Sequence, residues 1–214
     1  INRGIDTEYF NQTLNASIRD NIIKTHHIDT IKKIILFPAR ITSWKGQLEF
    51  LDVIKKMDTQ NIMVLFAGDI KNESYTNLVR DKIKQNNLEG VCKILGSVNQ
   101  DEMRSLYQLA DLSVSFPLRA EGFGRTISES LYSKTPVLAF DYGGVKNQLA
   151  NLSDMFKVKP QDYQALPAKI HKLLSLSEVQ KKEAIEGIQS VIEINFSKIN
   201  MVNQYLKLYE SLKS

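Results

Sequence analysis

One stretch of the sequence combines an apolar run, a glycine-containing loop and the start of a helix: residues 112–129, LSVSFPLRAEGFGRTISE. The run at 112–116 predicts a buried strand, and helical spacing begins near Thr126. Gly122 and Gly124 between them allow the backbone to approach a ligand closely. The amides of residues 123–126 are expected to open the helix, and exposed amides at a helix N-terminus bind anions.

The same alternation of short apolar runs and longer amphipathic stretches extends through the chain from residue 32. It predicts an α/β fold, a doubly wound Rossmann-like parallel sheet with helices on both faces. Near-continuous apolar runs are typical of strands that are covered on both sides. The predicted strands are 33–37, 62–67, 91–95, 112–116, 136–140 and 155–158, and the later predicted helices are 126–133, 163–176, 177–193 and 197–212.

The chain divides into three predicted parts. Residues 1–31 form a lead-in segment, with a turn in NRGID and a short helix marked by Leu14, Ile18 and Ile22. Residues 32–196 form the Rossmann-like domain. The helix in 197–214 is expected to pack on this domain or toward a missing N-terminal half, because the chain starts at Ile1 and resembles a fragment of a longer protein.

Composition excludes several classes of protein. With 43% apolar residues and a net charge of only +4, the chain is not disordered and does not resemble a nucleic-acid-coating protein. Cys92 is the single cysteine, which excludes an internal disulfide and predicts a buried, inert thiol. The three histidines lack metal-ligand spacing, so no metal site is predicted. The sequence has no apolar run of transmembrane length and no signal-peptide pattern, which favours a cytoplasmic protein.

A second candidate loop follows the first predicted strand: residues 37–46, FPARITSWKG. In a doubly wound sheet, ligands bind beyond the carboxyl ends of the strands, so both loops are candidate binding loops. Arg40 can hold phosphate oxygens with its planar fork, and Lys45 adds a mobile positive charge. Two solvated surface cations are the alternative interpretation.

Two carboxylates lie near the loop at residues 122–126, which contains Gly122 and Gly124 and is called the glycine loop below. Glu121 precedes the predicted helix and Glu129 lies within it, eight positions further on. Carboxylates accept hydrogen bonds from hydroxyls but repel phosphates, so the pair suits a ligand with hydroxylated rings on both sides of a diphosphate. A nucleotide sugar fits this description, with Glu121 facing the sugar and Glu129 the ribose. Each carboxylate taken alone is equally compatible with an ordinary role at a helix surface or N-terminus.

The motifs together resemble the C-terminal, donor-binding domain of a GT-B fold retaining glycosyltransferase of family 4, glycosyl transferases group 1. The resemblance covers nearly the whole chain. Its carriers are NRGIDTEYF at 2–10, the loop at 40–45, FAGD at 66–69, LGSV at 95–98, ADL at 110–112, EGFG at 121–124 with Glu129, and TPVLA at 135–139.

The resemblance implies roles for individual residues. Arg40 and Lys45 would bind the diphosphate and stabilise it as leaving group, and Glu121 would contact the sugar. Glu129 would hold the ribose hydroxyls. The implied catalytic residues are Arg40, Lys45 and Glu121, and the implied donor-binding residues are Gly68, Ser97, Val98, Gly122, Phe123, Gly124, Arg125, Thr126 and Glu129. Gly68 would border the donor, and Ser97 and Val98 would lie beside the nucleobase.

The implied reaction is transfer of a hexose-type sugar from a UDP- or GDP-sugar, with retention and without metal or other cofactor. The implied acceptor is a cell-surface polysaccharide or lipopolysaccharide, saccharide or lipid-linked, at the inner membrane surface. Arg125 departs from the family pattern, which commonly has an apolar residue there. Val145-Lys146-Asn147 replaces the usual Pro-Glu pair, and the acceptor-binding half is absent.

Two other classes stay open from the residues alone. An NAD-binding oxidoreductase would also place a Gly-x-Gly after a strand, but Ile127 stands where the third glycine of that fingerprint belongs. A noncatalytic α/β interaction module would use the same loops as scaffold. Nucleotide binding distinguishes the module from the enzyme.

Overall fold

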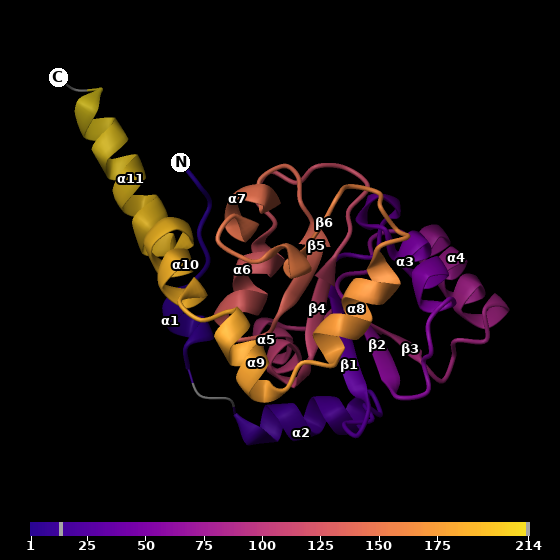
Figure 1. Ribbon diagram of the computed structural model, residues 1–214. Coiled ribbons are helices and arrows are strands. Elements are labelled where there is room, and N and C mark those ends of the chain that lie inside the picture. Colours follow the sequence, from indigo (N-terminus) through magenta and orange to yellow (C-terminus); the bar gives the residue numbers. More distant parts are fainter. Residues whose placement is uncertain (13–14, 213–214) are drawn as a thin grey trace.

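A single parallel sheet forms the centre of the computed structural model, which describes residues 1–12 and 15–212 (Figure 1). Its strand order is β3-β2-β1-β4-β5-β6, and every neighbouring pair is parallel. The order reverses between β1 and β4, as in dinucleotide-binding folds. The strands are β1 Lys33–Pro38, β2 Ile62–Ala67, β3 Cys92–Gly96, β4 Leu112–Ser115, β5 Val137–Phe140 and β6 Lys157–Val158.

The predicted α/β class is confirmed, because the apolar runs are buried on both sides. All six residues of β2 and the last five of β1 are buried. Helices cover both faces, with α3 against α4 and α8 in one set, and α5 against α2 and α6 in the other. The helices are α1 Thr7–Phe10, α2 Ala16–Thr25, α3 Gln47–Ile54, α4 Glu73–Gln85, α5 Gln100–Leu109, α6 Arg125–Tyr132, α7 Val145–Leu149, α8 Leu166–Leu174, α9 Glu178–Ala184, α10 Ile188–Phe196 and α11 Lys198–Ser211.

Two predicted elements differ most from the structure, and α8 is shorter at both ends than the helix expected over 163–176. The single helix expected over 177–193 is split into α9 and α10, because Gly187 adopts a left-handed backbone (φ 74°) and begins a new helix. The strand expected over 155–158 is reduced to β6, since a 3-10 helix over Asp154–Phe156, capped by Ser153, occupies its first half. The short helix of the lead-in is present as α2 with Ile22 buried, whereas Leu14 lies outside the described residues.

The lead-in segment is bound to the junction between α10 and α11. The Ile5 amide donates to the Phe196 carbonyl at 2.8 Å, and the Lys198 amide donates to the Ile5 carbonyl at the same distance. The two backbones touch at Gly4, where a Cβ atom would lie 2.3 Å from the Ser197 carbonyl carbon. Residues from the two ends of the chain therefore form one structural unit beside the sheet (Figure 1).

Helix α11 projects from the body of the molecule (Figure 1). None of its described residues is buried, and its exposed apolar side chains include Ile199, Val202, Leu206 and Tyr209. The sequence left two placements open for this helix, on the domain or toward a missing half. The structure shows no burial of α11 against the domain, and packing toward another part of a longer protein stays a prediction.

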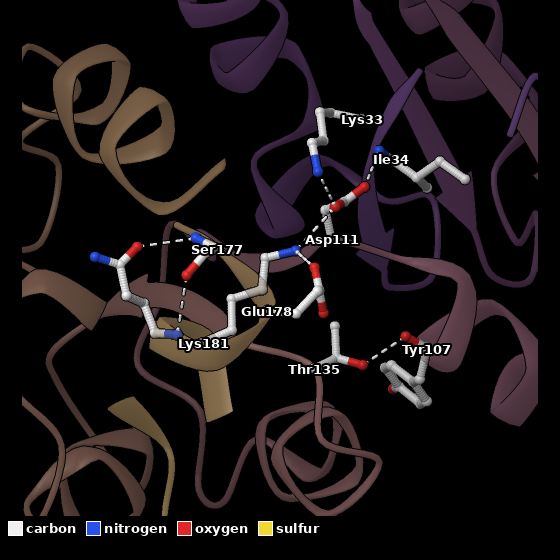
Figure 2. A network of polar contacts seen from close by, with 9 residues as sticks. Lys33, Ile34, Tyr107, Asp111, Thr135, Ser177, Glu178 and Lys181 are labelled. Atoms are coloured by element: carbon white, nitrogen blue, oxygen red, sulfur yellow. Dashed lines mark hydrogen bonds and ion pairs between the residues drawn. The ribbon is translucent and has the colours of Figure 1, made fainter. Parts of the chain in front are cut away.

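An ion-pair cluster at the amino ends of the strands ties α9 to the sheet (Figure 2). The Asp111 carboxylate accepts hydrogen bonds from Lys33 at 2.8 Å, Lys181 at 3.0 Å and the Ile34 amide at 2.9 Å. Burial alone would raise the pKa of Asp111, but these three donors lower it overall. Lys181, whose side chain is only 7% exposed, depends on Asp111 and Glu178 for its neutralising charge.

Replacing Asp111 with Asn is expected to lower the free energy of unfolding by about 2 kcal/mol at pH 7, because Lys181 keeps its charge and loses a buried partner. The lowered pKa means that the carboxylate stabilises the fold above pH ~4 and ceases to do so as the pH falls through the folded-state value. Urea unfolding at pH 7 and pH 3 measures both effects. Asp81→Asn, an exposed carboxylate on α4, is the control; equal stability of the two variants at pH 7 would contradict the prediction.

Candidate functional site

A cavity of about 850 Å³ opens at the carboxyl ends of β1 and β4, where the strand order reverses. This is the position at which doubly wound sheets bind ligands, and the volume suits a small molecule. The cavity is lined by the loop after β1, the end of β2, the loop from β4 into α6, Met103 of α5 and the first three residues of the chain. The two loops singled out in the sequence therefore meet at one site.

The loop after β1 carries Arg40, which is exposed at the cavity and forms no ion pair with the described residues. The loop is shaped from inside by Gln47, a fully buried residue of α3 whose Nε2 donates to the Arg40 carbonyl at 2.9 Å. The Tyr75 hydroxyl in turn donates to Gln47 Oε1. Gln47 was not predicted from the sequence, because no sequence pattern distinguishes a single buried glutamine from an exposed one in an amphipathic helix.

Lys45 and Glu121 bring the two loops together. The Lys45 ammonium forms an ion pair with Glu121 and lies 4.2 Å from the centre of the Trp44 ring. The Glu121 side chain is only 10% exposed, so the pair is largely shielded from water. Backbone contacts reinforce it, since the Leu118 amide donates to the Trp44 carbonyl at 2.8 Å. The sequence placed both residues at the site but did not predict that they pair.

The glycine loop delivers the N-terminus of α6 to the cavity. Gly124 adopts a left-handed backbone (φ 76°) as the N-cap, and no side chain caps the helix. Within the described residues, the amides of Gly124, Arg125 and Thr126 donate to no protein acceptor. Free amides at a helix N-terminus together with the helix dipole form an anion site.

The glycine loop is also held from inside by a buried glutamine, Gln148 of α7. Its Nε2 donates to the carbonyls of Phe123 and Gly124, and Ser128 donates to its Oε1. Gln148 is 1% exposed, so these hydrogen bonds form away from water and fix the loop. Neither Gln148 nor the short helix α7 that carries it was predicted from the sequence.

Glu129 is buried beneath this loop, with 6% of its surface exposed. Its Oε2 accepts from the Tyr107 hydroxyl at 3.0 Å, and its Oε1 accepts from Arg125 Nε at 3.0 Å and Nη2 at 2.7 Å. Burial raises the pKa of Tyr107 well above its usual value, and the charge of Glu129 raises it further, so this phenol is a permanent donor. Arg125 and Thr126 line the cavity, whereas Glu129 is not among the described residues that do.

The cavity includes Gly68, which is predicted to border the donor, but not the two residues predicted to lie beside the nucleobase. Gly68 lines the cavity, and a Cβ atom there would lie 2.2 Å from the Ala39 carbonyl oxygen, so a glycine lets the loops after β1 and β2 touch. Ser97 and Val98 are not among the described lining residues, and Ser97 instead donates to Asp69 Oδ1 at 3.0 Å. Their contact with a base stays a prediction.

The cavity carries an excess of positive charge. Of its described lining residues, four are basic and one is acidic: Arg3, Arg40, Lys45 and Arg125 against Glu121. No group of three or more His, Cys, Asp or Glu side chains lies together in the described part of the chain as metal ligands would. The thiol of Cys92 is buried in β3, which raises its pKa to about 12 and makes it unreactive. No helix of the described residues is long and apolar enough to cross a membrane.

A Rossmann-like sheet with a cationic cavity and an uncapped helix N-terminus at its switch point has the arrangement in which doubly wound domains bind phosphate groups. The sequence matches the family described as glycosyl transferases group 1 over residues 18–189. Because this match covers most of the chain, the chain belongs to that family, and the family resemblance drawn from the motifs is confirmed.

Relatives and solved structures agree with this assignment. A trehalose synthase from Pyrococcus horikoshii is 25% identical over 89% of this chain and 47% of its own length. A glycosyltransferase crystal structure from Rickettsia africae superposes with a TM-score of 0.91 at 29% identity, over 99% of this chain and 56% of that one. Anabaena HepE in complex with UDP-glucose shares the fold, with a TM-score of 0.83 at 21% identity, over 97% and 56% of the two chains. The chain spans about half the length of the curated relatives it matches.

Proposed function

We propose that this chain is the donor-binding domain of a retaining glycosyltransferase that uses a nucleotide sugar. The cavity between β1 and β4 carries the proposal, because it combines basic side chains, unpaired helix amides and two nearby carboxylates, each paired with one of the basic side chains. A diphosphate matches the cations and amides, and hydroxylated rings on either side match the carboxylates. That a protein of similar fold is solved with UDP-glucose favours UDP as the first nucleotide to test.

In the proposed complex, the diphosphate lies at the N-terminus of α6, between Arg40 and Lys45. Both cations are supplied by a loop whose shape Gln47 fixes before any ligand arrives. A loop fixed in this way holds Arg40 beside the leaving diphosphate before it binds, so that only the Lys45 side chain has to turn to stabilise the negative charge. Once Lys45 turns to the phosphates, Glu121 is free to accept a hydrogen bond from a sugar hydroxyl.

The sugar is proposed to be a hexose and the acceptor a cell-surface polysaccharide or lipopolysaccharide, lipid-linked or saccharide, reached at the cytoplasmic face of the inner membrane. These finer assignments rest on the family resemblance. We further propose that the exposed apolar side chains of α11 pack against the acceptor-binding half of a longer protein. No metal is assigned to the reaction, because the cations and amides suffice to neutralise a diphosphate.

Calorimetric titration of the chain with UDP, GDP, ADP and NAD, without and then with a divalent metal, tests the proposal. Metal-independent binding of one nucleoside diphosphate is the expected result, and it would also identify the base. Binding of NAD alone would instead favour an oxidoreductase. Absence of binding by all four, with circular dichroism showing a folded chain, would favour an interaction module.

A further inference from the structure

Glu121, which lines the cavity, and Glu129, which is buried beside it, are both paired with cations. Lys45 pairs with Glu121, and Arg125 places two N–H groups on Glu129 Oε1. The cations suited to phosphate therefore occupy the oxygens suited to hydroxyls. A ligand hydroxyl reaches either carboxylate only after its cation has moved.

The two cations differ in how far their side chains are exposed to solvent. The Lys45 side chain is 17% exposed and lies against Trp44. The Arg125 side chain is 62% exposed and lines the cavity, whereas the Glu129 side chain is 7% exposed. Arg125 is thus a solvent-exposed cover over a buried carboxylate.

The position of Arg125 on α6 adds a second argument. It is the first residue of the helix, beside free amides that carry the positive end of the helix dipole. The helix dipole disfavours a cation there, and it is the neighbouring Glu129 that holds the guanidinium in place and raises its pKa. An anion bound at this helix end removes that penalty and offers the guanidinium a new partner, whereas an uncharged ligand offers none.

Glu129 does not depend on Arg125 for its orientation. The Tyr107 hydroxyl holds Oε2, and Tyr107 is fully buried and stays protonated because burial raises its pKa. When Arg125 leaves, the carboxylate keeps its place and Oε1 becomes a free acceptor. Movement of Arg125 therefore exposes Glu129 Oε1, while the Tyr107 hydroxyl keeps the carboxylate in a fixed position.

Resting on the proposed function, we propose that Arg125 determines specificity by covering Glu129 until a diphosphate draws it away. The ribose of a nucleoside diphosphate then reaches Glu129, whereas a nucleoside without phosphates must break the Arg125–Glu129 pair with no compensating contact. The site thereby rejects nucleosides in favour of their diphosphates by more than the phosphate contacts alone supply.

The test compares uridine with UDP, and guanosine with GDP, by calorimetric titration of the parent, Arg125→Ala, Arg125→Lys and the control Arg119→Ala. Arg119 is an exposed cation of the same loop that is not among the described lining residues, so its loss changes net charge equally. Arg125→Ala is expected to weaken diphosphate binding about tenfold and to tighten nucleoside binding several-fold, because one charged contact is lost while the carboxylate is uncovered. Arg125→Lys is expected to fall between Arg125→Ala and the parent, since it keeps the charge without the two-pronged contact.

A double-mutant cycle tests whether the tighter nucleoside binding expected of Arg125→Ala depends on Glu129. In a Glu129→Gln background, Arg125→Ala should no longer tighten nucleoside binding, because no carboxylate is left to uncover. If the parent binds a diphosphate but Arg125→Ala weakens or leaves unchanged the binding of the matching nucleoside, the covering role is wrong while the proposed function stands. If the folded parent binds neither diphosphate, both proposals fail.

Discussion

Replacing Arg40 and Lys45 together with Ala is expected to weaken nucleoside diphosphate binding about a thousandfold. Hydrogen bonds to charged groups are worth ~1.5–3 kcal/mol each, and two such contacts correspond to about 4 kcal/mol. Arg40 forms no ion pair among the described residues, and its charge only contributes to lowering the pKa of Asp69. Calorimetric titration with UDP and GDP measures the loss, and urea unfolding checks whether Glu121, left without Lys45, destabilises the fold.

The matched control is Arg80→Ala with Lys84→Ala on α4. It removes the same number of positive charges from two exposed positions of a helix that does not line the cavity, where Arg80 pairs with the exposed Glu73. If it weakens binding as much as the cavity variant does, long-range charge accounts for the effect. A change of less than about twofold in the cavity variant would reduce Arg40 and Lys45 to solvated surface cations.

Gly144→Ala is expected to lower the free energy of unfolding by about 3 kcal/mol and to abolish ligand binding. A Cβ atom at Gly144 would lie 2.0 Å from the Gly122 carbonyl oxygen, so the glycine loop or α7 has to move. The backbone of Gly144 is right-handed helical (φ −67°, ψ −19°), a conformation that alanine adopts readily. Any destabilisation therefore comes from the close approach of this Cβ atom to the Gly122 carbonyl group and the Phe123 Cα atom, and thermal or urea unfolding measures it.

Gly90→Ala is the control for this prediction. Nothing lies within 4 Å of a Cβ atom at Gly90, and its backbone φ is not in the left-handed region. Alanine there is expected to stabilise the chain by about 0.5 kcal/mol through the unfolded state. If Gly144→Ala and Gly90→Ala have the same free energy of unfolding, the glycine loop accommodates the added Cβ atom without loss of stability, and the prediction is wrong.

The sequence was sufficient to predict features that depend on local pattern. Five of the six predicted strands agree with the structure to within one residue at each end, because buried parallel strands are short apolar runs. The convergence of Arg40, Lys45 and the 122–126 loop at one cavity followed from the rule that ligands bind beyond the carboxyl ends of parallel strands.

Features that depend on contacts between distant segments could not be predicted from the sequence. The pairing of Lys45 with Glu121 joins residues 76 positions apart, and the hydrogen bond from Tyr107 to Glu129 spans 22. Gln47 and Gln148 resemble ordinary helix residues until the folded chain places a carbonyl beside each. The break at Gly187 was overlooked because apolar spacing continues on both sides of it.

The two buried glutamines also bear on how the loops tolerate sequence change. Gln47 and Gln148 bind backbone carbonyls, which every residue possesses, and not the side chains of the loops they support. The path of each loop is thus separated from the identity of the residues along it. Arg125, which lines the cavity, can therefore be replaced without loss of the hydrogen bonds that Gln47 and Gln148 donate to the loops. Ligand recognition at the cavity can thus vary while the two loops keep their paths.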